Sequence, residues 1–122
     1  LTSGTTATAI PNYGVTAINV TTAAASTGSS VGTTEVGLSW VLDAPTEGVR
    51  KLIYMSNTTG SSAGAVIEFG TGVTAWWSSF GTTYTGALLQ GGQGAWLSLM
   101  GGSTSRWVFI GSNTSTSLAS SN

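Results

Sequence analysis

The acidic side chains of this sequence are four carboxylates: Glu35, Asp43, Glu47 and Glu68. A glycoside hydrolase needs two carboxyl groups that face each other across a sugar at about 5–10 Å, and no spacing among these four ties a pair together. The sequence contains neither histidine nor cysteine, which removes the usual general base, the thiolate nucleophile and the commonest metal ligands. A lysine can act as the base that activates a serine nucleophile, but serines occur near Lys51 by chance because the chain is rich in serine. The sequence therefore predicts no catalytic residue and no enzyme activity.

Metal and cofactor sites are equally poorly supported. Asp43, Glu47 and backbone carbonyls could hold calcium, but acids in turns are ordinarily solvated, and the acidic spacing of an EF-hand is absent. The glycines of residues 91–94 are not followed by a helix, as a phosphate-binding loop requires, so we expect a turn there. Asn-x-Ser/Thr sequences arise by chance in so hydroxyl-rich a chain, and they occur at Asn19, Asn57 and Asn113. We expect no metal and no cofactor.

Aromatic side chains offer the remaining chemistry. Trp76, Trp77 and Tyr84 lie near polar loops of Gly, Thr and Ser, a composition suited to stacking on sugar rings or to a contact with another protein. The alternative is that these rings fill the core or a subunit interface, because a small domain depends on large aromatic residues for burial. Adjacent strand residues point to opposite faces, so only one of the two tryptophans is expected in the core.

The low charge of the chain limits its partners. Of 122 residues, seven are charged, which is 6% of the chain with a net charge of −1, whereas soluble surfaces typically carry about 25% charged residues or more. No basic patch exists that could replace counterions on phosphates, so we expect no nucleic-acid binding. No apolar run approaches the roughly 20 residues needed to span a bilayer, so we expect no membrane insertion. Much of the surface is either covered by partners or kept soluble by hydroxyl groups alone.

The clearest element is a strand followed by a corner. Apolar side chains alternate with small or polar neighbours over residues 36–42, which is the period-two pattern of a half-buried strand. Pro45 cannot continue a strand ladder and Gly48 can adopt a positive φ, so residues 44–48 are expected to turn the chain. The pattern predicts a hairpin-like corner.

The strand that leaves this corner, residues 49–55, is apolar on both faces beyond Arg50 and Lys51. Such a strand is expected to be central and covered twice, either by a second sheet or by another subunit. Its charges are then explained by solvation of the corner or by pairing between subunits. We therefore place Arg50, Lys51 and Tyr54 among the candidate interface residues.

The rest of the chain indicates short strands separated by Gly, Ser and Thr loops. Further strands are expected at residues 14–20, 65–69, 73–80, 87–89, 95–100 and 106–110. The last two are predicted to form a hairpin across the loop 101–105. About seven or eight strands and no helix predict a single all-β domain, either a β-sandwich or a small jelly-roll-like β-barrel. We expect an N-terminal arm at residues 1–12, the domain at residues 13–111 and a polar tail at residues 112–122.

Residues 41–53 resemble a motif found in small virion surface proteins of tailed bacteriophages. The motif is a strand that ends in Leu, then x-Ala-Pro, two residues, Gly, two residues, Lys and an apolar strand. Tyr13-Gly14-Val15 resembles the start of the same pattern, and residues 94–100 and 105–110 resemble its end. The resemblance covers roughly residues 13–111, although residues 21–34 are longer than the pattern suggests.

Proteins of this type are capsid decoration (cement) or head-fibre proteins. The resemblance implies a β-sandwich or barrel that forms a homotrimer on the outer capsid surface and bridges neighbouring subunits of the major capsid protein. The N-terminal arm would then order against the capsid, with Ile10, Pro11 and Tyr13 as anchors, and Trp76 and Trp77 complete the candidate interface residues. The competing possibilities are a phage fibre or tail component, or a receptor-binding module that holds a glycan through one of these two tryptophans.

Overall fold

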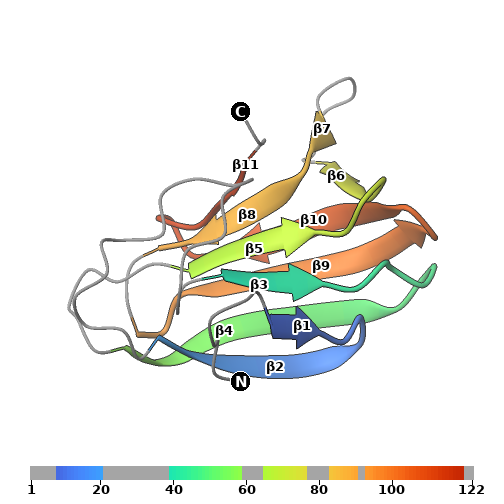
Figure 1. The fold of residues 1–122 in the computed structure, drawn as a ribbon. Coiled ribbons are helices and arrows are strands. Elements are labelled where there is room, and N and C mark those ends of the chain that lie inside the picture. The colour runs from blue at the N-terminus through green and yellow to red at the C-terminus, as the bar shows by residue number, and fades with distance from the viewer. Residues whose placement is uncertain (1–7, 21–38, 59–64, 77–82, 91–92, 120–122) are drawn as a thin grey trace.

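The computed structural model describes residues 8–20, 39–58, 65–76, 83–90 and 93–119. These residues form eleven strands and no helix, arranged as two packed sheets (Figure 1). One sheet has five strands in the spatial order β1 (Thr8–Ile10), β3 (Ser39–Leu42), β5 (Ala65–Phe69), β8 (Gly86–Leu89) and β11 (Ser117–Ala119). The other has six, in the order β2 (Gly14–Val20), β4 (Arg50–Thr58), β9 (Trp96–Ser103), β10 (Arg106–Ser112), β6 (Thr74–Trp76) and β7 (Thr83–Tyr84). The predicted all-β sandwich is confirmed, and the described strands form no closed barrel.

Successive strands alternate between the two sheets through the first half of the chain. β1, β3 and β5 lie in the five-stranded sheet, whereas β2, β4 and β6 lie in the six-stranded one. Because each connection crosses to the opposite sheet, strands two apart in sequence run in the same direction and become neighbours. The pairs β1–β3, β3–β5 and β2–β4 are accordingly parallel. The antiparallel β9–β10 hairpin lies between β4 and β6, so β6 pairs with β10 instead of with β4.

The corner after β3 joins the two sheets, which corrects the predicted hairpin. Gly48 adopts a φ of 78°, as expected for the turn, but β3 and β4 belong to different sheets. The corner lies on the backbone of β9, where the Gly48 N–H donates to the Gly101 carbonyl at 2.8 Å and the Gly101 N–H donates to the Val49 carbonyl at 2.9 Å. Gly101, expected in a loop, is therefore a buried strand residue, and the hairpin turns at residues 104–105.

Both chain ends contribute strands where the sequence indicated an arm and a tail. β1 pairs in parallel with β3, and its Ile10 is completely buried in the core. β11 pairs with β8 and buries Leu118. Each strand has three residues, which is too short to show a periodic pattern, so tertiary pairing and one buried side chain define them. The sandwich therefore extends to residues 8–10 at one end and to residues 117–119 at the other.

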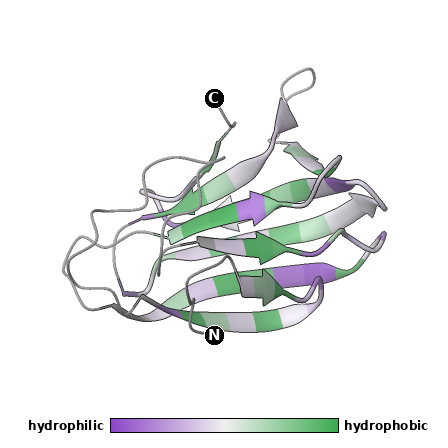
Figure 2. Ribbon diagram, viewed as in Figure 1, coloured by the Kyte–Doolittle hydropathy of each residue, from purple (hydrophilic) through white to green (hydrophobic). Residues whose placement is uncertain are grey.

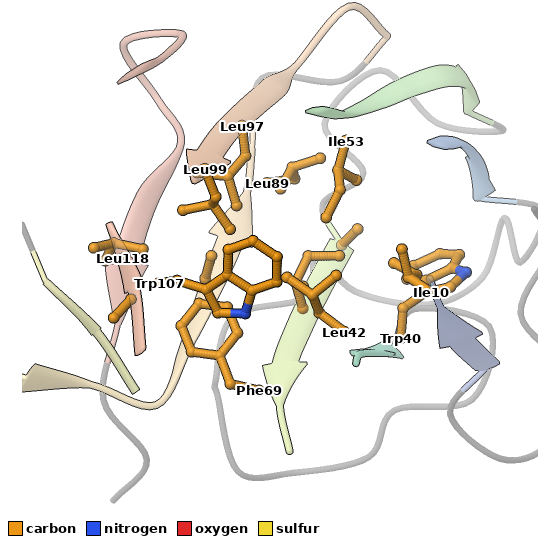
Figure 3. Packing of buried hydrophobic residues seen from close by; sticks show 14 of the residues in the cluster. Ile10, Trp40, Leu42, Ile53, Phe69, Leu89, Leu97, Leu99, Trp107 and Leu118 are labelled. Atoms are coloured by element: carbon orange, nitrogen blue, oxygen red, sulfur yellow. The ribbon is translucent and has the colours of Figure 1, made fainter. Parts of the chain in front are cut away.

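The core lies between the sheets and is built from alternate residues of their strands (Figure 3). Trp40 and Leu42 of β3 point inward, as the period-two pattern predicted. Ala65, Ile67 and Phe69 also point inward, as expected, while Glu68 does not. Trp107 lies among Leu42, Phe69 and Leu99, and Trp40 lies beside Ile10 (Figure 3). Both indole rings are fully buried, and neither Nε1–H has a hydrogen-bond partner among the described residues.

Candidate functional site

The most unusual surface of the described protein is the outward side of the six-stranded sheet. Its large apolar side chains that remain exposed are Tyr13 (65%), Val15 (65%), Ile110 (44%), Trp96 (38%) and Tyr54 (37%). Four of these lie on β2, β4, β9 and β10, which are adjacent in the sheet, and Tyr13 directly precedes β2. Figure 2 shows the strongly hydrophilic strand segments as short purple stretches on β4, β5 and β10. We call the outward side of β2, β4, β9 and β10 the outer face.

Strand registers bring the outer-face residues together. Tyr54 of β4 is the direct cross-strand partner of Trp96 of β9. Two residues before Tyr54 on β4, Leu52 is the register partner of Val15 on β2 and of Ser98 on β9. In an antiparallel pair such as β4 and β9, directly opposed residues have Cβ atoms about 4.5–5.5 Å apart, so Tyr54 and Trp96 are within contact distance. The outer face therefore gathers apolar side chains from four adjacent strands, with the hydroxyl of Ser98 among them.

Trp96 is held in a defined position on this face. Its backbone N–H donates to Asn113 Oδ1 at 2.9 Å, and its carbonyl accepts from the Asn113 N–H at 3.3 Å. A Cβ placed on Gly111 would lie 3.3 Å from Cη2 of the Trp96 ring, so the ring lies over the backbone of β10 where a glycine leaves room for it. Asn113 Nδ2 also donates to the Gln90 carbonyl at 2.9 Å. The side-chain nitrogen of Asn113, the first residue of an Asn-x-Ser/Thr sequence, is therefore hydrogen-bonded within the protein.

Trp76 has a different environment. The Arg106 guanidinium lies 4.0 Å from the centroid of its ring, which is a cation–π contact. Trp76 and Val108 are register partners on β6 and β10, so this pair extends the outer face toward the edge of the sheet. One side of the Trp76 ring is covered by Arg106, and that side is closed to a sugar ring. Trp77, the other tryptophan proposed for glycan stacking, lies outside the described residues.

Lys51 is the one lysine of the chain, and it points inward. Its side chain is 1% exposed, and Nζ donates to the Tyr13 carbonyl at 3.0 Å and to Thr16 Oγ1. These bonds join the start of β2 to β4. Burial lowers the pKa of the ammonium group below its ordinary value of 10.5, and the charge of Asp43 partly opposes this shift. Lys51 is therefore a structural residue of the interior.

The lowered pKa of Lys51 predicts how stability depends on pH. Between the folded-state pKa and 10.5, the unfolded chain binds more protons at this group than the folded chain does. The free energy of unfolding should therefore rise with pH across this window. Urea denaturation from neutrality to pH 10.5, compared between the wild type and Lys51→Met, isolates the effect because the two proteins differ only at this residue. Parallel pH profiles for the two proteins would contradict the assignment.

The structure separates the candidate interface residues into three groups. Pro11, Tyr13, Arg50 and Tyr54 are exposed and can contact a partner. Ile10 and Lys51 are buried within the chain, so their expected place at an interface is corrected: one fills the core, and the other bonds to β2. Trp76 is partly buried against Arg106.

Sequence reasoning missed Val15, Trp96 and Ile110, which contribute much of the outer face. A signal for Trp96 was present, because residues 96–100 are apolar on both faces in the same way as residues 49–55. Ile110 had no such signal, since it is exposed at a register shift between Phe109 and Gly111 that only strand pairing reveals.

Within the part of the chain that the structure describes, no group of three or more acidic, histidine or cysteine residues is placed to hold a metal ion. The same residues include no helix that is long and apolar enough to cross a membrane. Comparisons with protein families, with curated proteins and with solved structures give no match to this chain.

Proposed function

We propose that this protein is a structural component of a virus particle: a capsid decoration protein that binds the outside of a phage head. In this role it stabilises the head by bridging subunits of the major capsid protein, and it performs no catalysis. The observation that carries the proposal is the outer face, where exposed apolar side chains gather on four adjacent strands. A contiguous exposed apolar surface of this kind marks a site of association. The likeness of residues 41–53 to phage virion surface proteins supplies the identity of the partner.

The low charge of the chain supports the same proposal. With seven charged residues in 122, the protein presents little electrostatic repulsion to a large, closely packed assembly. A protein that binds the assembled shell but not its separated subunits stabilises the shell by mass action. The exposed Pro11 and Tyr13, which lie in the segment between β1 and β2, are the residues we propose for contact with the capsid. A homotrimer would supply three such contacts at once.

The experiment uses phage heads that lack this protein, prepared from the phage that encodes it. Addition of the purified chain should saturate the heads at a fixed ratio and raise the temperature at which they release their DNA. Electron cryomicroscopy of the decorated heads should place its density on the outer capsid surface. Absence of binding to heads would refute the proposal, and density confined to the tail would favour the fibre or tail alternative.

A second candidate function is glycan binding. The observation that favours it is the adjacent pair Tyr54 and Trp96, with the Trp96 ring lying over Gly111 and partly exposed. Aromatic rings held in this way can stack on the apolar side of a sugar. A glycan array should then show a ligand whose binding is lost in Trp96→Ala. An array without any bound glycan would leave protein association as the function of this face.

A further inference from the structure

Residues 11–13, which we call the β1–β2 loop, present exposed apolar side chains at one end of the sandwich. Pro11 is exposed, and Tyr13 is 65% exposed. The loop lies at the same end as the corner between β3 and β4 (Figure 1). Its residues belong to neither strand, so strand pairing does not fix their conformation. The shape of the loop therefore depends on hydrogen bonds from other parts of the chain.

The side chain of Asn12 attaches the loop to the corner. Its Nδ2 donates to the Ala44 carbonyl at 2.6 Å and to Thr46 Oγ1 at 3.1 Å. Directly before the loop, the Ile10 carbonyl accepts from the Asp43 N–H at 3.0 Å. The corner is itself hydrogen-bonded to the backbone of β9, as described above. The loop is thus joined to a part of the molecule that is fixed to the six-stranded sheet.

Lys51 holds the loop from the interior. Its Nζ donates to the Tyr13 carbonyl at 3.0 Å and to Thr16 Oγ1 of β2. Hydrogen bonds from a charged donor are shorter and stronger than those between neutral groups. Gly14 adopts a φ of 72°, which lets the chain bend from the loop into β2. The backbone of Tyr13 is therefore held on both sides of its α-carbon, while its ring is left exposed.

We infer that the β1–β2 loop is a preformed contact, in which Asn12 and Lys51 act as positioning residues that hold Tyr13 ready for the partner; the inference rests on the proposed function, which assigns Pro11 and Tyr13 to the capsid contact. An arm that orders only on binding loses its conformational entropy at that moment, which weakens the complex. A loop that is already fixed in the free protein has lost this entropy on folding, so its contacts contribute more fully to affinity.

Tyr13 and Pro11 also indicate the chemistry of the partner surface that fits them. A tyrosine combines a flat apolar ring with a hydroxyl group, and such rings often form the centre of a protein interface. Pro11 adds a second apolar group of fixed shape. Residues 8–20 include no charged side chain. The matching site on the capsid protein is therefore an apolar pocket with a hydrogen-bonding group for the tyrosine hydroxyl.

The first test measures the mobility of the loop in the free protein by ¹⁵N NMR relaxation of the full chain. The backbone order parameter of Tyr13 should match those of β2 and β4, at about 0.85. Asn12→Ala should lower it, while the strands keep their values. An order parameter for wild-type Tyr13 clearly below those of the strands would overturn the inference, and so would a value that Asn12→Ala leaves unchanged.

The second test measures binding to phage heads that lack this protein. Asn12→Ala should bind about tenfold more weakly, because ordering the backbone of one residue costs about a factor of ten in a binding constant. Thr46→Val removes one acceptor of the same Asn12 amide and should weaken binding in the same direction, which preserves the test if Asn12→Ala does not fold. Far-UV circular dichroism checks that each variant is folded.

Thr116→Val is the matched control. The Thr116 side chain is buried and also makes two hydrogen bonds: its Oγ1 accepts from the Gln90 N–H at 3.2 Å and donates to the Gln90 carbonyl at 3.3 Å. Asn113 links Gln90 to the start of β9, whereas the corner lies against the end of that strand. The control should lose stability and keep wild-type affinity. Equal losses of affinity in Thr116→Val and Asn12→Ala would show that Asn12 acts only through stability, which would overturn the inference.

A double variant tests whether Asn12 acts through Tyr13. Tyr13→Ala should weaken binding by itself, and the addition of Asn12→Ala should cause no further loss, because both changes remove the same contact. Additive losses would show that Asn12 contacts the partner directly and would contradict its positioning role.

The outcomes separate the inference from the proposed function. If the wild type fails to bind heads, decoration is refuted, while the order parameters still decide whether the loop is preformed. If the wild type binds heads and Tyr13→Ala or Asn12→Ala binds them equally tightly, decoration stands and the inference is overturned.

Discussion

Gly101→Ala should lower the free energy of unfolding by about 3 kcal/mol, because the new methyl group has no space. A Cβ at this position would overlap the carbonyl oxygen of Thr46 and lie 2.7 Å from its carbonyl carbon. Both atoms belong to the backbone of the corner between the sheets, so a change of side-chain rotamer cannot relieve the overlap. The corner would have to move, and the two backbone hydrogen bonds that join it to Gly101 would weaken.

Gly70→Ala is the matched control for this substitution. A Cβ on Gly70 would come no closer than 4.0 Å to Val73 Cγ2, and the backbone there does not adopt positive φ. Its effect should lie within about 0.5 kcal/mol of zero. Urea denaturation followed by far-UV circular dichroism, at one protein concentration, measures both variants. Equal stabilities of the two variants would show that the corner is not packed on Gly101.

Trp107→Ala should be the most destabilising of the substitutions considered, at about 4 kcal/mol, because it leaves a large cavity at the centre of the sandwich. Trp107 is fully buried and lies among Leu42, Phe69 and Leu99 (Figure 3). Its indole Nε1–H has no hydrogen-bond partner among the described residues. A buried donor without a partner contributes nothing to stability and retains its desolvation penalty.

Trp107→Phe should therefore cost only about 1.5 kcal/mol, since it removes part of the ring and no hydrogen bond. The comparison of the two variants by urea denaturation tests the unpaired state of the nitrogen. If the phenylalanine variant were nearly as unstable as the alanine variant, the indole N–H would be bonded in solution.

The sequence predicted individual strands better than their arrangement. The alternation around Trp40 and Leu42 correctly indicated which side chains enter the core, because side-chain direction in a strand depends only on local geometry. Sheet membership depends on contacts between distant residues, so the corner after Leu42 resembled a hairpin while it joins two sheets. β1 and β11 were hidden for a related reason, since three residues have no period to detect.

The candidate site was predicted less completely than the strands. A strand that is apolar on both faces does not reveal which face enters the core. In β9 the larger Trp96 points outward, whereas Leu97 and Leu99 fill the interior. In β4 the charged Lys51 points inward beside Ile53, and Tyr54 is exposed. Only the packing of one sheet on the other decides between the two faces, and that packing is not a local property.

The alternation of strands between sheets also constrains the order in which the chain can acquire its structure. Among the described strands of the six-stranded sheet, β9 and β10 connect the β2–β4 pair to the β6–β7 pair. Both of these joining strands lie after residue 95, so during synthesis the β2–β4 pair and the β6–β7 pair are both made before the strands that unite them. Pairing that waits for distant segments is slow, because loop closure costs entropy before the contacts form. Once both strands have been synthesised, the β9–β10 hairpin can form before the long-range pairs because its contacts are local in sequence. The outer face is complete only after this hairpin has formed.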